Sequence, residues 1–320
     1  MIEEIVSVDL PIDEKLTIKK NRLLPVDFNE DMPEGMKRIS IVTGIHGDEL
    51  EGQYVCYELQ RRIAKERDKL TGIVDIYPAM NPLGIDSITR GIPAFDLDMN
   101  RLFPGNIDGN MTEYIAAGII DDVKGSDCVL DIHASNIYLT EIPQIRINEL
   151  HEDFLLPLAM KSNVDFVWVH GASTVLESTF AYSLNSIGTP VLVVEMGVGM
   201  RLTIDYGDQL VDGIFNIMQE LGIWSGSVNA VRNPFVSRDP DDISYLNATA
   251  GGLFIPKVKH GASLIKGDLI GEIVNPLNGE VLEEVRAEWD GMLFTIRDYP
   301  IVDEGSLMGR MLKAEVCADE

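Results

Sequence analysis

Residues 38–49 read RISIVTGIHGDE. The first half of this stretch is rich in β-branched residues and predicts a β-strand. A glycine-containing turn follows, and apolar residues then recur every four positions between 55 and 63, with charged residues among them. That spacing is typical of an amphipathic helix with one buried face. The segment therefore predicts a strand, a tight turn that carries His46 and Glu49, and a helix.

The same alternation of strand and helix continues along the chain. Four further stretches are short, apolar and β-branched, and we expect strands at 73–77, 129–133, 164–169 and 191–195. Helical patterns cover about 113–123 and 206–221. Strands that alternate with helices predict an α/β domain of three layers, with a mixed, largely parallel sheet.

The pattern changes in the last third of the chain. From about residue 253 no long helical stretch occurs, and turn pairs with glycine recur at intervals of roughly ten residues, which predicts a small β-sandwich or barrel. We place a catalytic domain at 1–228 and a β-rich C-terminal domain at 229–320, which we expect to shape the active-site cleft. Residues 1–36 are broken by prolines and stay unassigned.

Charge excludes several classes of function. The 320 residues include 26 Lys+Arg and 52 Asp+Glu, a formal net charge of -26. Such a surface repels phosphate backbones and anionic lipids, so we expect neither a nucleic-acid nor a membrane partner. Three cysteines lack metal or redox spacing, and the first residues lack the features of a signal peptide, so we expect a cytoplasmic protein. The sequence leaves a homo-oligomer open.

Residues with catalytic chemistry follow three of the expected strands. His46 and Glu49 follow the first, His133 ends another, and Glu195 ends an apolar run. Ligands gather at the carboxyl ends of parallel strands. Two imidazoles and a carboxylate form a ligand set of hydrolytic zinc sites, and a further carboxylate, here Glu195, can accept the proton of the attacking water.

Each of these residues also has a simpler interpretation. The pair His46 and Glu49 could be a solvated helix start, His133 a hydrogen-bonded core histidine, and Glu195 a cap of the next segment. Only their occurrence together at three strand ends favours a metal site.

Arginines in the loops before residue 105 could bind a carboxylate. Arg90 and Arg101 lie where an acidic protein could bind an anionic substrate, because guanidinium groups bind carboxylates through two hydrogen bonds. The alternative is that Arg101 forms a structural ion pair with Asp98 or Asp96.

Four motifs together resemble the succinylglutamate desuccinylase/aspartoacylase family, a branch of the zinc carboxypeptidase superfamily. They occur in the family's order and approximate spacing within roughly residues 37–225. The four motifs are Gly44-x-His46-Gly47-x-Glu49-x-x-Gly52, Asp98-x-Asn100-Arg101-x-Phe103-Pro104-Gly105, Asp131-x-His133 and Val194-Glu195-x-Gly197. The resemblance implies a zinc-carboxypeptidase-like catalytic domain. The C-terminal β-rich region also matches the family in position and kind.

The resemblance implies a role for each matched residue. It implies one zinc ion per subunit, held by His46, Glu49 and His133. It implies that Glu195 acts as general base and later as acid, and that Arg90 polarises the scissile carbonyl. It also implies that Asn100 and Arg101 bind a substrate carboxylate. Asp131 either orients the imidazole of His133 or makes a strand-end hydrogen bond. The family's further arginine upstream of the catalytic glutamate has no counterpart in residues 181–186, which argues against a dicarboxylate substrate.

The implied function is that of a zinc-dependent deacylase that hydrolyses the amide bond of a small N-acyl amino acid or related carboxylate-bearing amide. Two alternatives stay open: a metallocarboxypeptidase that acts on peptide C-termini, and a non-catalytic metal-binding or scaffold protein.

Overall fold

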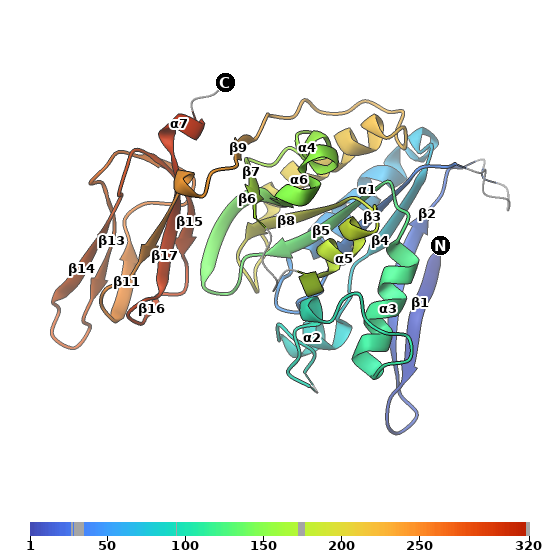
Figure 1. The fold of residues 1–320 in the computed structure, drawn as a ribbon, viewed down its shortest axis with the longest axis horizontal. Coiled ribbons are helices and arrows are strands. Elements are labelled where there is room, and N and C mark those ends of the chain that lie inside the picture. Colours follow the sequence, from blue (N-terminus) through green and yellow to red (C-terminus); the bar gives the residue numbers. More distant parts are fainter. Residues whose placement is uncertain (27, 29–34, 94, 172–176, 318–320) are drawn as a thin grey trace.

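The computed structural model describes residues 1–26, 28, 35–93, 95–171 and 177–317. Within this part of the chain, thirteen strands form one mixed sheet, and four more form a separate antiparallel sheet near the C-terminus. Helices flank the large sheet, and the small sheet lies at the far end of the molecule (Figure 1).

The centre of the large sheet is parallel. Its four strands lie in the order β4 (Ile73–Tyr77), β3 (Arg38–Thr43), β5 (Cys128–Ala134) and β8 (Val191–Gly197). They are the apolar, β-branched stretches that the sequence predicts as strands, and most of their side chains are buried. Burial on both faces explains the continuous apolar runs, because parallel sheets are covered by helices on each side.

Antiparallel strands extend this centre on both sides. The strands β1 (Ile2–Asp9) and β2 (Lys15–Leu23) form a hairpin, and β2 pairs with β4. On the other side β6 (Leu139–Asn148) is antiparallel to β8, and β7 (Phe166–His170) and β9 (Phe235–Ser237) follow β6 in parallel. The hairpin lies in the region that the sequence analysis leaves unassigned, and β6 was not expected.

Helices cover both faces of the sheet and form the outer layers. One core cluster packs α1 (Glu51–Lys65), α4 (Glu152–Ala159) and α6 (Ile204–Glu220) on one face. A second cluster packs α3 (Met111–Val123) and α5 (Phe180–Ser186) on the other. The short helix α2 (Pro82–Ser87) lies between β4 and α3, and the short helix α7 (Ala314–Cys317) follows β17. Among the described helices, none has both the length and the apolar character to cross a bilayer.

The C-terminal strands divide between the two sheets. The strands β10 (Ile243–Asn247), β12 (Ala262–Leu264), β15 (Gly291–Arg297) and β17 (Leu307–Lys313) join the large sheet, where β15 pairs with β6. The small sheet contains β14 (Val281–Arg286), β13 (Leu269–Val274), β11 (Gly252–Pro256) and β16 (Ile301–Val302). The predicted fold class is confirmed, whereas the boundary at residue 228 stays a prediction.

Candidate active site

Two glycines shape the turn between β3 and α1. Gly44 has a φ of 72°, in the left-handed region that glycine adopts without a steric penalty. A Cβ atom at Gly47 would lie 2.0 Å from the carbonyl carbon of Gly84, so only glycine permits this close approach. The chain therefore turns sharply before α1, and His46 and Glu49 are carried at the end of the sheet.

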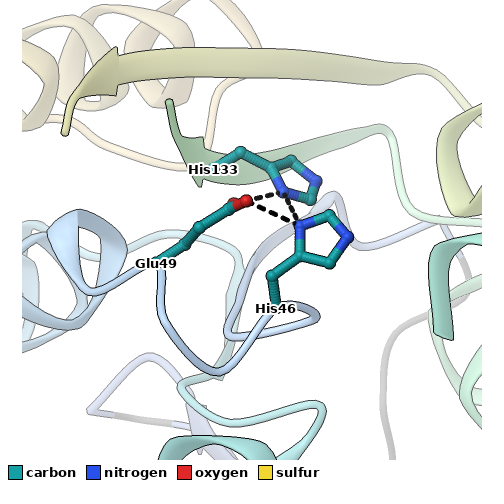
Figure 2. Close-up of side chains that lie close together, drawn as sticks. All are labelled: His46, Glu49 and His133. Atoms are coloured by element: carbon teal, nitrogen blue, oxygen red, sulfur yellow. Dashed lines mark hydrogen bonds and ion pairs between the residues drawn. The ribbon is translucent and has the colours of Figure 1, made fainter. Parts of the chain in front are cut away.

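His46, Glu49 and His133 point toward one another at this end of the sheet (Figure 2). Oε1 of Glu49 lies 2.8 Å from Nδ1 of His46, and Oε2 lies 2.8 Å from Nδ1 of His133. One ligand atom from each residue lies within 4.8 Å of the others, and all three residues are buried. Two imidazole nitrogens and a carboxylate in this arrangement form a candidate site for a divalent metal ion.

The far nitrogen of each imidazole faces a carboxylate. Nε2 of His46 lies 3.0 Å from Oδ1 of Asp98, and Nε2 of His133 lies 3.2 Å from Oδ2 of Asp131. Histidines that bind metals usually have such a partner, which fixes the tautomer and the ring orientation so that Nδ1 is presented to the ion. The residues present therefore fit a zinc-type site. Asp131 lies at ion-pair distance from His133 without a hydrogen bond to Nε2, so its orienting role stays a prediction.

Two carboxylates that contact the histidines, those of Glu49 and Asp98, are held in the charged form. Burial alone would raise the pKa of Glu49, but the charges and hydrogen bonds of His133 and His46 outweigh it and keep this pKa well below its usual range. Burial likewise opposes ionisation of Asp98, and the hydrogen bond with His46 lowers its pKa well below the usual value. Both groups are therefore anionic at neutral pH, as binding of a cation requires.

Arg90 lies against the same carboxylates. Its Nη1 is 2.7 Å from Oε1 of Glu49, and its Nη2 is 3.6 Å from Oδ2 of Asp98. The guanidinium thus lies next to the candidate metal site, on the side of the loop that carries Asp98. Its predicted action on the scissile carbonyl stays a prediction.

Glu195 lies on β8, in register with His133 on the neighbouring strand β5. Burial raises the pKa of Glu195, although the charges of Arg146 and His133 oppose this shift. A carboxyl group with a raised pKa holds a proton more readily near neutral pH, which suits a group that must accept and then return one. The role of general base stays a prediction.

One cavity of about 500 Å³ collects the predicted site residues. Those that line it are His46, Glu49, Arg90, Asn100, Arg101, His133 and Glu195. His170, at the end of β7, also lines this cavity. The predicted site residues, which are separated by up to 149 positions in the sequence, thus meet in one space large enough for a small ligand.

Asn100 and Arg101 are held differently from the other polar groups of the cavity. Oδ1 of Asn100 accepts a hydrogen bond of 2.9 Å from the backbone N–H of Phe180, which fixes the orientation of the amide. Arg101 forms no ion pair within the described residues, because Asp98 pairs with His46 and Arg90 instead. The alternative pairing of Arg101 with Asp98 or Asp96 is not observed, and its charge stays available to a ligand.

Three further charged residues of the cavity were missed in the sequence analysis. Glu141 and Arg146 lie on β6, and Arg310 lies on β17 near the C-terminus. Charged residues within an apolar stretch are a signal of function, but no sequence pattern shows that β6 lies beside β8. Arg310 is also 115 positions beyond Glu195, so local patterns could not connect the two.

Comparison with protein families identifies residues 35–221 as a succinylglutamate desuccinylase/aspartoacylase catalytic domain. A curated relative from Halomonas elongata, N-alpha-acetyl-L-2,4-diaminobutyric acid deacetylase, is 29% identical over 260 residues, which cover 78% of this chain and 74% of that protein.

Solved structures share the fold over nearly the whole chain. The product-bound ectoine utilization protein EutE (DoeB) from Ruegeria pomeroyi has a TM-score of 0.79 at 20% identity, covering 98% of this chain and 95% of that one. A succinylglutamate desuccinylase/aspartoacylase from Rhodobacter sphaeroides has a TM-score of 0.78 at 22% identity, with coverage of 98% and 95%. Together with the motifs and the buried His46–Glu49–His133 cluster, the family match shows that this chain belongs to the succinylglutamate desuccinylase/aspartoacylase family and is a deacylase-type hydrolase.

Proposed function

We propose that the protein is a zinc-dependent deacylase that hydrolyses the amide bond of a small N-acyl amino acid, with one zinc ion per subunit. The observation that carries the proposal is the convergence of two imidazole nitrogens and a carboxylate in the cavity that also contains Glu195 and Arg101. The set combines a metal-binding group, a proton acceptor and a cationic anchor, which are the parts that metal-assisted amide hydrolysis needs.

The ion would be held by Nδ1 of His46, by Nδ1 of His133 and by a carboxylate oxygen of Glu49. When bound, zinc would lower the pKa of the attacking water and polarise the amide carbonyl. Glu195 takes the proton of the attacking water and later gives it to the nitrogen of the leaving amine. Arg90 stabilises the negative charge that develops on the carbonyl oxygen.

Asn100 and Arg101 hold the carboxylate of the substrate. The amide of Asn100 is fixed by the N–H of Phe180, and Arg101 has no acidic partner among the described residues. A substrate carboxylate therefore supplies the missing counter-charge, and it orients the scissile amide within the cavity.

The first substrate to test is an N-acetylated amino acid, because the curated relative from Halomonas elongata is a deacetylase of N-alpha-acetyl-L-2,4-diaminobutyric acid. Purified, zinc-loaded protein is assayed against a panel of N-acetyl, N-succinyl and N-formyl amino acids and against dipeptides with free amines. We expect release of free amino acid from one or more N-acyl compounds and none from the dipeptides.

Cleavage of the dipeptides alone would show a metallocarboxypeptidase. Absence of turnover together with absence of zinc uptake in calorimetry would show a non-catalytic protein. His46→Ala serves as the control, since it removes one ligand and should abolish both zinc binding and activity.

We also propose a cytoplasmic location. Cys56, Cys128 and Cys317 are free thiols, which suits a reducing compartment. Cell fractionation followed by immunodetection tests this proposal.

A further inference from the structure

Four charged side chains form a continuous series beside the candidate metal site. Oε1 of Glu195 lies 3.3 Å from Nη1 of Arg146, and Nη2 of Arg146 lies 3.0 Å from Oε2 of Glu141. The other oxygen of Glu141 accepts a hydrogen bond from Arg310, and Oγ1 of Thr295 lies 3.3 Å from this oxygen. The series runs from β8 through β6 to β17, and so connects Glu195 to the C-terminal strands.

An irregularity in β6 brings two of these residues to the same cavity. Glu141 and Arg146 are five positions apart, and in a regular strand an odd separation places side chains on opposite faces. The register with β8 shifts between Glu141 and Gln144, next to Pro143, and both charged residues line the cavity. The irregularity thus lies between the two charged residues.

Both arginines are fixed by aromatic rings. The guanidinium carbon of Arg146 lies 5.8 Å from the ring centre of Trp168, and that of Arg310 lies 5.7 Å from the ring centre of Tyr245. Cations at such distances are attracted to the ring face. Two arginines and two carboxylates also balance in charge, in contrast to Arg101, and among the described residues Nε of each arginine is left without a hydrogen-bond partner.

We propose that Arg146 is a positioning residue for Glu195, and that Glu141 and Arg310 hold Arg146 in place. Because Nη1 contacts Glu195 while Nη2 contacts Glu141, the guanidinium fixes the Glu195 carboxylate at one end and is itself anchored at the other. The C-terminal strands then contribute to the reaction through Arg310, which anchors this series. This inference rests on the proposed role of Glu195 as general base.

A double-mutant cycle tests whether Arg146 acts through Glu195. In the wild-type background, Arg146→Met should lower kcat by about 10- to 100-fold, the scale of a misplaced catalytic group, with KM changed less than about twofold. In the Glu195→Gln background the same substitution should change the residual kcat less than about twofold, since its target is already lost. Arg146→Lys should restore part of the activity.

Two results would overturn the proposal. Additive losses in the cycle would show that Arg146 acts independently of Glu195, and a rise in KM at constant kcat would show that it binds substrate. If Arg146→Met fails to fold, Glu141→Gln serves in its place, because it keeps the shape of the side chain and removes the charge that anchors Arg146. The same lowered kcat at constant KM is expected, and unchanged kcat would contradict the proposal.

A readout without turnover separates this inference from the proposed function. In crystals of zinc-loaded Arg146→Met, or of Glu141→Gln, we expect the Glu195 carboxylate to occupy a different or a divided position relative to wild type. An unchanged, fully occupied position would overturn the positioning role even if the enzyme proves active. Failure of the wild-type protein to cleave any N-acyl amino acid would instead overturn the proposed function.

Discussion

Nε2 of His46 lies 3.0 Å from Oδ1 of Asp98, while Nδ1 of the same ring lies 2.8 Å from Glu49. The two nitrogens of one imidazole thus have separate partners, one on the loop before Asn100 and one in the candidate metal site. Asp98 thereby connects the orientation of a proposed metal ligand to the loop that carries Asn100 and Arg101, the proposed substrate-binding pair.

Replacement of Asp98 by Asn should weaken zinc binding. The amide keeps the shape of the side chain but loses the charge that orients His46 and supports its basicity, so we expect a loss of affinity of about 10- to 100-fold. Competition with a chelator of known affinity measures it. The matched control is Asp96→Asn, an exposed position two residues earlier, which should leave the affinity unchanged. Equal affinities of wild type and Asp98→Asn would contradict the role of Asp98.

Replacement of Glu195 by Gln should leave zinc bound and abolish most turnover. The glutamine cannot accept the proton of the attacking water, and general acid–base catalysis contributes about 10²-fold or more. Metal content by elemental analysis and kcat on the best N-acyl substrate are measured on the same preparation. Near-normal kcat in this variant would show that another group is the base.

Replacement of Arg101 by Met should act on substrate binding. Among the described residues Arg101 has no acidic partner, so its loss removes a hydrogen-bonded charge pair with the substrate. Such a pair contributes about 1.5–3 kcal/mol, so kcat/KM should fall by roughly 10- to 100-fold. We expect most of this effect in KM. Arg61→Met, on the outer face of α1, is the control and should leave KM unchanged. An unaltered KM for Arg101→Met would place the substrate carboxylate elsewhere.

The stability of the protein should depend on Glu58 in a pH-dependent manner. A hydrogen bond from Arg61 is the main cause that lowers the pKa of Glu58, and a second hydrogen bond, from Arg62, lowers it further. Together they outweigh the opposing effect of burial and bring this pKa to about 2. This pKa lies below the value of about 4.3 in an unfolded chain, so the ionised group stabilises the folded state above that pH, and the contribution is lost as the pH falls toward 2.

Glu58→Gln should therefore be less stable than wild type at pH 7, and the difference should shrink as the pH is lowered through 4 toward 2. Urea unfolding of metal-free protein at several pH values measures it, with metal removed so that acid release of the ion does not contribute. Glu66→Gln, an exposed position beyond the end of α1, is the control. A difference that stays constant with pH would show that the ion pairs of Glu58 contribute nothing.

The sequence predicts the centre of this fold because its evidence there is local. The strands at 38–43 and 191–195 are short, β-branched apolar runs closely followed by glycines, and this pattern is typical of buried parallel strands. His46, Glu49 and His133 follow from the same reasoning, since parallel strands that are neighbours bring their carboxyl ends to one edge.

Features that depend on distant pairing were missed for a physical reason. The hairpin β1–β2 is stabilised by its position beside β4, and β6 contains Pro143 and an irregular register that hide its strand pattern. Arg310 reaches the cavity only because β15 joins the C-terminal strands to β6. Contacts of this kind are properties of the assembled sheet and have no local signature in the chain.

Anomalous diffraction at the zinc absorption edge, from crystals of zinc-loaded protein, locates the metal ion directly. We expect a single strong peak per subunit, about 2.0–2.2 Å from Nδ1 of His46, Nδ1 of His133 and a carboxylate oxygen of Glu49. A peak outside the reach of these three atoms, or none in protein that has been supplied with zinc, would contradict this expectation.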